Sequence, residues 1–509
     1  MEPAVVSTGL VALYLLVTLG VGFVANRKLA INVEDFFLYG RRAGIVVLYL
    51  TVVATYHSAF AFLGSSGFFY THGIGFWDAG TWTVLVGASS YVLGSRIWAL
   101  GKKFGYVTPA DLLADFYESE AVRVTVALVS VLFTILYIQV QAQGLGYIIA
   151  VASGDRISFE LGTLILLVVA ALYLVMGGLR AVYWTDVVQG VWMYVAIWVG
   201  ALFLSYEIFG GPLALWRRVA AERPELLTLP GPSGYFTPGM WFGMMVSLCG
   251  VLFMPQMMIR YYTAVSENTI KWLGATTPIY LVTLYIPAAF VGLGGALVLP
   301  DIEIPDRVFP DLLFRYAPPW LSGLVLAGAA AAAMSTLDSI LHANMTVLTR
   351  DVYQRYVRPG RSQAHYVKAG RVFVLALLVV GYLLAVHTFE LLVVLVSISG
   401  SGALQLAPAV CNVCFPTRRM LTRAGVLAGI AAGLAVLFCT LVVWPNPLGT
   451  HGSVWGLGAN LAVAWTVSCF TRRPSAETVW RIHGEMERFV YGAQRDQAGV
   501  TTPISPGCR

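Results

Sequence analysis

Long apolar stretches separated by short polar loops dominate the pattern of the chain. A bilayer core about 30 Å thick requires about 20 apolar residues per helix, and stretches of that length recur from one end of the sequence to the other. The pattern therefore predicts an all-α integral membrane protein. About thirteen transmembrane helices are expected, near residues 4–26, 44–70, 76–101, 122–151, 157–177, 182–207, 238–260, 272–299, 319–349, 367–387, 389–414, 424–445 and 453–471.

Composition agrees with a membrane protein and excludes a soluble globular one. Of the 509 residues 58% are hydrophobic and 11% are charged, and the mean hydropathy is +0.75. The net charge of +6 does not indicate a nucleic-acid partner, because basic residues gather in loops where they set topology and face anionic lipid. No linker divides the chain, so residues 1–509 are predicted to form a single transmembrane domain.

The distribution of Lys and Arg predicts the orientation. With the N-terminus outside, roughly 26 of the 32 basic residues lie on the cytoplasmic side, which is the bias expected of membrane proteins. We therefore expect an external N-terminus, an odd number of spans, a cytoplasmic tail at 472–509 and residence in the cell (plasma) membrane.

The order of the spans predicts an internal repeat. Residues 44–207 and 238–414 each hold five spans, and because five is odd, the second set starts from the opposite side of the membrane. An inverted repeat places solute and ion sites at the midplane, where the first helix of each half is interrupted. Breakers occur in both first helices, at Gly64–Gly67 in the first set and at Gly250 and Pro255 in the second.

The stretch AAAAAMSTLDSILH, Ala329 to His342, places a polar face inside an apolar span. Ala332, Ser335, Thr336 and Ser339 have the i, i+3, i+4, i+7 spacing of one helix face, with Asp338 at its edge. Hydroxyl and carbonyl oxygens suit a hard cation such as sodium, and small alanines allow a second helix to approach. The alternative is that these hydroxyls bond back to their own helix. A carboxylate near the bilayer centre favours a functional site.

A second deep carboxylate, Asp186, lies in GGLRAVYWTDVVQG. It is expected to share a cation with Asp338, to carry a proton, to pair with Arg180, or to cap the helix after the Gly177–Gly178 break. In LYIQVQAQGLGY, the amides of Gln139, Gln141 and Gln143 indicate a polar cavity wall or hydrogen bonds between helices.

These segments resemble the sodium/solute symporter family, whose members share the leucine-transporter fold. The resemblance covers nearly the whole chain and rests on AAAAAMSTLDSILHANMTVLTRDVYQ, GGLRAVYWTDVVQG and RYYTAVSENTIKWLGA. It implies an inverted five-helix repeat with one extra N-terminal and two extra C-terminal helices. It also implies a cation-coupled transporter with sodium as co-transported substrate and no further cofactor.

The resemblance assigns candidate sites by position. The family's sodium site corresponds here to carbonyls of Ala54, His57 and Ala332 and to hydroxyls of Ser335 and Thr336. A further cation or proton site of some members corresponds to Asp186, Asp338 and Ser339, with Ser335 shared between the two sites. Predicted residues lining the solute site are Tyr56, Ser58, Gln141 and Gln256.

The predicted function is sodium-coupled import of a small organic solute by alternating access. Tyr56 stands where proline-transporting members carry an aspartate, whereas GYVTPADLLADFYES and LYIQVQAQGLG resemble the branch that carries short monocarboxylates such as lactate and pyruvate. The alternatives are proton coupling, or an amino acid, pantothenate or another small solute. An enzyme is not expected, because no nucleophile, base or metal cluster has suitable spacing. A transporter-like sensor would need an output module, for which the tail is short.

Overall fold

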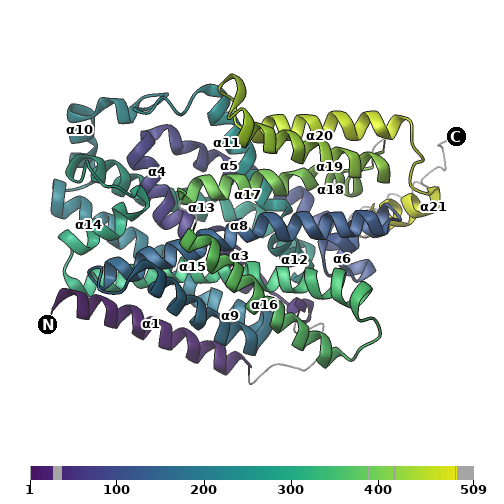
Figure 1. Cartoon of the computed structure of the whole chain (residues 1–509), viewed down its shortest axis with the longest axis horizontal. Helices are drawn as coiled ribbons and strands as arrows, with labels where there is room; N and C mark the ends of the chain where they lie inside the picture. The colour runs from purple at the N-terminus through teal and green to yellow at the C-terminus, as the bar shows by residue number, and fades with distance from the viewer. Residues whose placement is uncertain (1, 27–36, 388–389, 417–419, 488, 490–509) are drawn as a thin grey trace, which may run out of the picture.

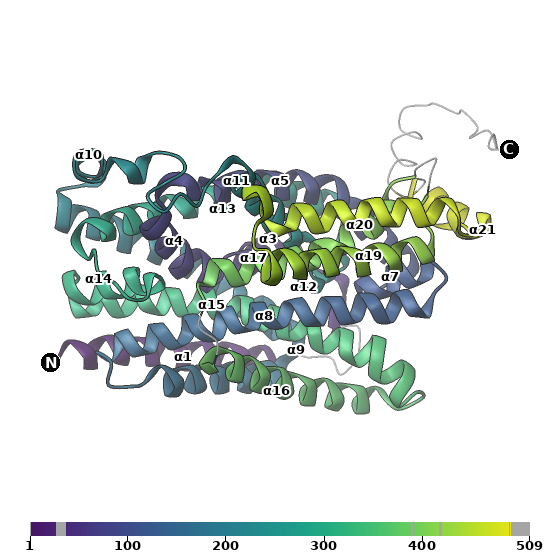
Figure 2. The same cartoon turned by 45° about the horizontal axis from the view of Figure 1, so that its top comes forward.

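The computed structural model describes residues 2–26, 37–387, 390–416, 420–487 and 489. All regular secondary structure in these ranges is helical, as the hydropathy pattern predicts. The helices run mostly along one axis of an elongated bundle (Figure 1). The N-terminal helix starts at one end of this bundle and the C-terminal helices finish at the other, which fits an odd number of crossings (Figures 1 and 2).

Nine helices among the described residues are long and apolar enough to cross a membrane, or ten if the bent pair Pro238–Phe253 and Pro255–Thr263 is one span. Each of the thirteen predicted stretches contains helix, although that exact number of crossings stays a prediction. The main helices are α1 (Pro3–Asn26), α3 (Ile45–Tyr56), α4 (Ser65–His72), α5 (Asp78–Ser89), α6 (Ser95–Phe104), α8 (Glu120–Ala152), α9 (Phe159–Phe209), α11 (Pro238–Cys249), α12 (Pro255–Thr263), α13 (Glu267–Val298), α15 (Pro319–Val347), α16 (Gln363–His387), α17 (Leu392–Ala403), α18 (Ala407–Cys414), α19 (Arg423–Phe438) and α20 (Gly452–Cys469).

The second predicted span is broken, as expected. Helix α3 ends at Tyr56, His57 is extended (φ −94°, ψ 100°), and a wide helical turn over Phe60–Gly64 leads into α4. The predicted breakers, Gly64 and Gly67, lie beyond this point. The chain is instead interrupted at His57 and Ser58, without a glycine or a proline at the break.

The seventh span is broken by the residues that the sequence indicates. After α11 a tight turn covers Gly250–Phe253, Met254 is extended, and Pro255 starts α12 at an angle of 49°. Proline suits the first turn of a helix, where no backbone N–H is needed. Gly250 is required by packing, because a Cβ there would lie 1.8 Å from the carbonyl oxygen of Gly400 on α17.

Helix α9 (Phe159–Phe209) contains two of the predicted spans. Gly178 has φ 54° and ψ −155°, a left-handed backbone that glycine adopts at little cost, and the helix kinks there. The kink falls between the predicted spans 157–177 and 182–207, and the second part carries Asp186 to the middle of the bundle.

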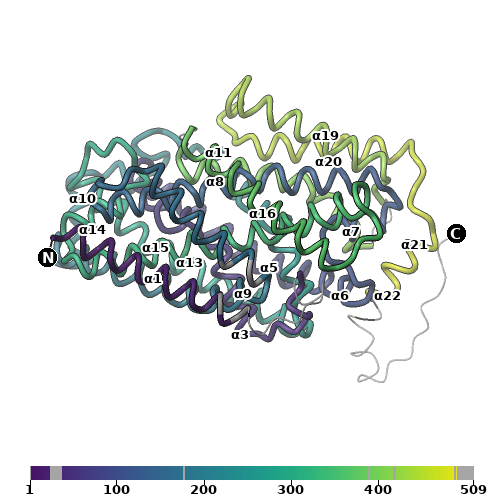
Figure 3. Tube along the Cα trace, turned by 60° about the horizontal axis from the view of Figure 1, so that its bottom comes forward, coloured from purple at the N-terminus to yellow at the C-terminus, as the bar shows by residue number. Residues whose placement is uncertain are grey.

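Among the long apolar helices of the described residues, α15 is the most enclosed. It packs against α9, α1 and α8, and in its most apolar window 94% of residues are buried. Helices α19 and α20 pack on each other at one edge of the bundle, whereas α1 lies along the opposite side (Figures 1 and 3). The polar face of α15 therefore points into protein rather than lipid.

Short helices close the two ends of the bundle. At the N-terminal end lie α10 (Pro212–Glu222) and α14 (Val308–Tyr316). At the other end α7 (Pro109–Phe116) starts with a reciprocal cap between Thr108 and Asp111. The described part of the predicted tail packs there through α21 (Ala476–Val479) and α22 (Glu485–Glu487), and residues 490–509 lie outside the described ranges.

Candidate functional site

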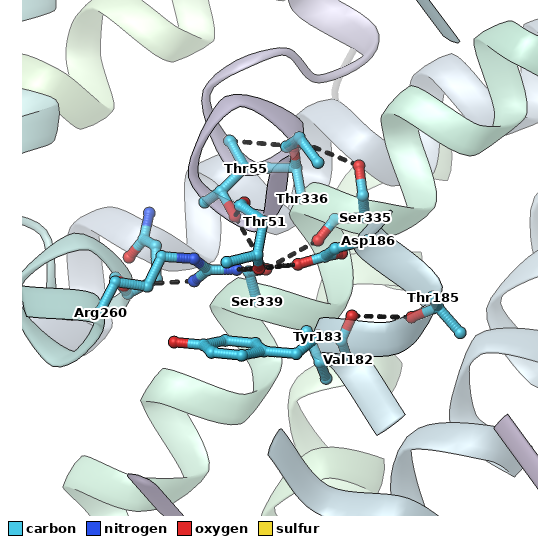
Figure 4. A network of polar contacts seen from close by, with 12 residues as sticks. Thr51, Thr55, Val182, Tyr183, Thr185, Asp186, Arg260, Ser335, Thr336 and Ser339 are labelled. Atoms are coloured by element: carbon cyan, nitrogen blue, oxygen red, sulfur yellow. Dashed lines mark hydrogen bonds and ion pairs between the residues drawn. The ribbon is translucent and has the colours of Figure 1, made fainter. Parts of the chain in front are cut away.

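Oxygen atoms of α3 and α15 converge beside the first helix break (Figure 4). The Ser335 hydroxyl lies 2.9 Å from the Ala54 carbonyl oxygen and 3.0 Å from that of Ala332. The Thr336 hydroxyl lies 3.2 Å from the Ala54 carbonyl and 3.1 Å from the Thr55 carbonyl. All of these residues are buried. Four of the five predicted sodium ligands thus meet in a compact group of uncharged oxygens, which we call the oxygen cluster: the carbonyls of Ala54, Thr55 and Ala332 with the hydroxyls of Ser335 and Thr336.

The fifth predicted ligand, His57, is the residue at which α3 stops. Its backbone is extended, and its ring Nδ1 lies 3.3 Å from the Val53 carbonyl oxygen. His57 is notable for its place in the backbone and not for its imidazole ring. The helix stops at His57, so its backbone is extended and lies next to the oxygen cluster.

Side chains stabilise the break by replacing lost helical hydrogen bonds. The backbone N–H of Ala59 donates to Oε1 of Gln141 at 3.0 Å, and the N–H of Phe60 donates to the Ser58 hydroxyl at 3.1 Å. Tyr137 donates in turn to the Ser58 hydroxyl at 3.3 Å. Gln141 and Ser58 were predicted to line the solute site. In the structure they accept hydrogen bonds from backbone N–H groups at the break, and so stabilise it, because unpaired buried N–H groups are costly.

A second polar group surrounds the buried guanidinium of Arg260 on α12 (Figure 4). Its Nη2 donates to the Ser339 hydroxyl at 2.6 Å, to the Thr51 hydroxyl at 2.9 Å and to Oδ2 of Asp186 at 3.0 Å. Thr51 also donates to the same carboxylate oxygen. The Tyr183 ring lies 5.6 Å from the guanidinium carbon. We call Arg260, Asp186, Ser339 and Thr51 the arginine cluster.

The two clusters are joined by a short chain of hydroxyls. Thr55 and Ser339 lie 3.1 Å apart through their hydroxyl oxygens, and Ser339 donates to the Ser335 carbonyl at 2.8 Å. Thr55 donates to the Thr51 carbonyl at 2.7 Å. The Ser339 hydroxyl therefore contacts both Arg260 and the backbone of Ser335.

Two residues of the predicted second cation site, Asp186 and Ser339, both contact the guanidinium of Arg260. Arg180, one of the partners considered for Asp186 from the sequence, is not the arginine in this ion pair. Asp338 precedes Ser339 on α15 and is buried. Both carboxylates lie within electrostatic range of Tyr14 on α1.

The two remaining predicted lining residues, Tyr56 and Gln256, lie next to the breaks. Tyr56 is buried, and its ring centre lies 6.1 Å from that of Trp82 on α5. Gln256, one residue into α12, donates to the sulfur of Met254 at 3.2 Å, while its Oε1 has no partner in the described structure. Both predicted lining residues therefore flank a break.

Three further residues near the first break were not selected from the sequence. Trp82 and Asp78 lie one turn apart on α5, and Tyr285 on α13 has its ring centre 6.0 Å from that of His57. All three are buried, and Asp78 lies within electrostatic range of Tyr285. Neither Asp78 carboxylate oxygen has a partner of good hydrogen-bond geometry in the described structure, although the backbone N–H of Ala79 is nearby. Buried carboxylates in membrane helices mark functional sites by default.

Signals for two of the missed residues were present in the sequence. Asp78 follows Gly75–Trp77 at the start of an apolar span, so the argument applied to Asp338 applies equally to it. Arg260 ends the apolar run MPQMMIR, where a lone cation one turn after a proline break needs a buried partner. For Trp82 and Tyr285 nothing in the pattern separates them from ordinary buried aromatics.

Two broken helices with buried polar clusters beside them, in the middle of a helical bundle, are typical of secondary transporters. The Sodium:solute symporter family model matches residues 36–433, which is most of the chain. The chain belongs to this family of membrane-embedded, sodium-coupled symporters.

Characterised relatives agree with the family. The chain is 28% identical over 390 residues to the sodium/pantothenate symporter of Escherichia coli (strain K12), covering 74% of this chain and 78% of that one. It is 24% identical to the sodium/proline symporter of Staphylococcus aureus (strain USA300), covering 92% of this chain and 93% of that one. These relatives do not support the narrower prediction of a lactate- or pyruvate-like solute.

Solved structures establish the fold. A Na+-coupled sialic acid symporter in its substrate-bound outward-open state superposes with a TM-score of 0.77 at 16% identity, covering 92% of this chain and 99% of that chain. Mhp1, a nucleobase-cation-symport-1 family transporter, superposes with a TM-score of 0.60 at 14% identity, covering 89% and 99%. The chain therefore has the leucine-transporter fold that the resemblance implied. The exact number of spans and the repeat bounds stay predictions.

Proposed function

We propose that the chain imports a small organic solute by symport with sodium, and that sodium binds at the oxygen cluster. The observation that carries this proposal is the meeting of Ser335, Thr336 and the Ala54 carbonyl within 3.2 Å at a helix break. A hard cation prefers oxygen ligands, and it would replace the hydroxyl-to-carbonyl hydrogen bonds now formed there. The His57 carbonyl is proposed to complete the shell.

Sodium at this place would tie two parts of the transporter together. Ala54 lies on the first broken helix, whereas Ser335 and Thr336 lie on the enclosed α15. A bound cation therefore stabilises one arrangement of the broken helix against α15, and its departure allows another. If sodium raises solute affinity, the solute must raise sodium affinity by the same factor.

The solute is proposed to bind between the two breaks, against Tyr56, Gln256, Trp82, Tyr285 and Asp78. Indole N–H and phenol O–H groups suit the carboxylate that pantothenate and proline share, aided by the N-terminus of half-helix α12. In its ionised form the Asp78 carboxylate accepts hydrogen bonds, so this form favours a solute that also carries an N–H or O–H donor. We therefore propose a small organic carboxylate with at least one such donor, which disfavours acetate and pyruvate.

Orientation follows from the same proposal. Import requires a site reached from outside, and the basic-residue bias supports an external N-terminus and a cytoplasmic tail in the plasma membrane. The two termini lie at opposite ends of the bundle, as an odd number of crossings requires (Figure 1).

Uptake into proteoliposomes tests the proposal. Labelled pantothenate, proline, alanine, lactate, pyruvate and acetate are offered with an inward sodium gradient, with an inward proton gradient, or with neither. Sodium-driven accumulation of pantothenate, proline, alanine or lactate, but not of pyruvate or acetate, is expected. Accumulation that follows only the proton gradient would replace sodium coupling by proton coupling. Specific binding with no accumulation under any gradient would indicate a sensor.

A further inference from the structure

We propose that residues 475–487 form a strap across the tail end of the bundle, and that this strap must loosen before the solute leaves on that side. The strap comprises α21, the helical turn Trp480–Gly484 and α22, and it lies beside α6 (Figure 3). It contributes no residue to the oxygen cluster or to the proposed solute site. The inference rests on the proposed alternating access and on a tail that faces the cytoplasm.

Two apolar side chains anchor the strap. Ile482 and Met486 are four residues apart on a continuous helical segment, and both are buried in the main hydrophobic core. Trp480, by contrast, is 62% exposed. A segment that buries one face and exposes another is docked on the protein, so the strap has a defined place at the end of the bundle.

Two ion pairs of opposite sense fix the strap on this surface. Nη2 of Arg481 lies 2.9 Å from Oδ1 of Asp115 on α7. Oε2 of Glu485 lies 2.9 Å from Nζ of Lys103 on α6. The strap thus offers a cation to α7 and an anion to α6, and sliding it along the surface would break both pairs. All four side chains are partly exposed, so salt in the surrounding water weakens these contacts.

The strap ties α6, which packs on half-helix α12, to α18. Nε2 of His483 donates to the Val413 carbonyl on α18 at 3.0 Å, whereas Lys103 lies in the last turn of α6. Helices α6 and α12 touch so closely that a Cβ at Gly101 would lie 2.1 Å from the Tyr262 ring. Movement of α12 at this end therefore requires α6 to move, and the strap opposes that movement.

Cys414 reports on the opening of this region. Its side chain is completely buried, and it follows Val413, the residue that His483 contacts. Cys414 lies within electrostatic range of Tyr262 on α12 and of Tyr117 at the end of α7. A thiol reagent in the water must wait until these elements separate. Labelling of Cys414 therefore measures opening at the tail end without any solute or sodium.

Salt tests the inference without a change to the strap. A parent protein that keeps Cys414 and carries serine at the other five of its six cysteine positions is exposed, on the tail side, to a membrane-impermeant maleimide. The Debye length falls from about 10 Å in 0.1 M salt to about 3 Å in 1 M salt, here supplied as choline chloride. Labelling several-fold faster at high salt is expected. Equal labelling at the two concentrations would overturn the inference.

Exchange of the two charges locates the effect at the strap. Arg481→Asp places two carboxylates together and should speed labelling several-fold at low salt. Adding Asp115→Arg restores an ion pair and should return labelling to the parent rate. Arg473→Asp makes the same change of charge at an exposed residue outside the strap and should leave labelling unchanged. Parent-rate labelling of Arg481→Asp, or fast labelling of the exchanged protein, would overturn the inference. If Arg481→Asp does not fold, the salt response still decides.

Uptake separates the strap from the proposed function. Sodium-driven uptake of the preferred solute is expected to start faster in Arg481→Asp than in the parent, and at the parent rate in the charge-exchanged protein. Faster labelling without faster uptake would show that the strap does not control release, which overturns the inference. Absence of sodium-driven uptake from every protein would instead contradict the proposed function and leave the labelling results intact.

Discussion

Nη2 of Arg260 and Oδ2 of Asp186 lie 3.0 Å apart in the middle of the bundle, and both side chains are almost completely buried. Each charge of an ion pair at this depth depends on the other. If one partner is removed, the remaining charge is buried without water and without a counter-charge. The pair joins α12, which follows the second break, to α9. It therefore couples the position of a broken helix to the surrounding bundle.

Breaking this pair on one side should destabilise the protein more than replacing both partners. Asp186→Leu leaves a buried guanidinium without its carboxylate and is expected to cost about 3–5 kcal/mol of stability. The double variant Asp186→Leu with Arg260→Met buries no charge and should recover much of that loss. Thermal unfolding in detergent measures both. A double variant less stable than Asp186→Leu would show that the pair does not act as a unit.

Removing the amide of Gln141 should weaken the first break. In Gln141→Leu the Ala59 N–H loses its acceptor, and a buried unpaired donor costs about 1–3 kcal/mol. A lower unfolding temperature and slower uptake are expected. Leu132→Ala on the same helix is the control, because that side chain is 60% exposed on the bundle surface. Equal effects of the two substitutions would contradict the capping role.

Adding one methyl group at Gly250 should disturb the second break. The new Cβ would lie 1.8 Å from the Gly400 carbonyl oxygen, so the turn or α17 must shift. Overpacking of this kind costs about 1–3 kcal/mol or more, and uptake by Gly250→Ala is expected to fall sharply. Gly458→Ala is the matched control, since no atom lies within 4 Å of a Cβ there. Wild-type uptake by Gly250→Ala would mean that the two helices do not need this close approach.

A loop carboxylate should make stability depend on pH. Asp306 lies in the loop between α13 and α14 and accepts a hydrogen bond from the Leu392 N–H at 2.9 Å. Burial raises the pKa of its carboxyl to about 7, against the hydrogen bond and with the help of the nearby Glu390 charge. A raised pKa means that the folded state holds the proton more tightly than the unfolded chain, so this stabilisation is complete at low pH and lost as pH rises through about 7.

The isosteric amide separates this effect from other titrations. Asp306→Asn keeps an acceptor for Leu392 but has no proton to lose. Its unfolding temperature should fall less than that of wild type between about pH 4 and pH 8, and it should be the more stable protein at pH 8. Parallel pH profiles for the two proteins would contradict the assignment to Asp306.

Helical periodicity was enough to predict site residues that lie on the same helix. Ser335, Thr336 and Ser339 share one face of α15 because of their spacing, and all three are buried there. Pro255 predicted the second break because its ring dictates a local conformation. The first break was harder: His57 and Ser58 are not breakers, and the interruption there is stabilised by Gln141, which is distant in sequence.

The pattern of hydrophobic and polar residues could not predict which side chains on different helices contact each other. Asp186 was a candidate from its depth alone, but its partner, Arg260, lies 74 residues away on another helix. Local spacing offered Arg180 as one of several possible partners and gave no information on the pairing with Arg260. Gln141 was expected to line the solute site, yet its amide oxygen accepts from the Ala59 N–H in the turn after α3 and its amide nitrogen donates to the Tyr137 carbonyl. Only the packed structure reveals these contacts.

The sodium dependence of uptake tests the central claim most directly. Initial rates for the preferred solute are measured over a range of sodium concentrations in wild type, in Ser335→Ala with Thr336→Ala, and in Ser322→Ala, a buried control whose hydroxyl on the same helix has no partner in the described structure. Loss of two oxygen ligands should raise the half-saturating sodium concentration at least about tenfold in the double variant and leave the control unchanged. An unaltered sodium dependence in the double variant would show that the oxygen cluster is helix packing and that sodium binds elsewhere.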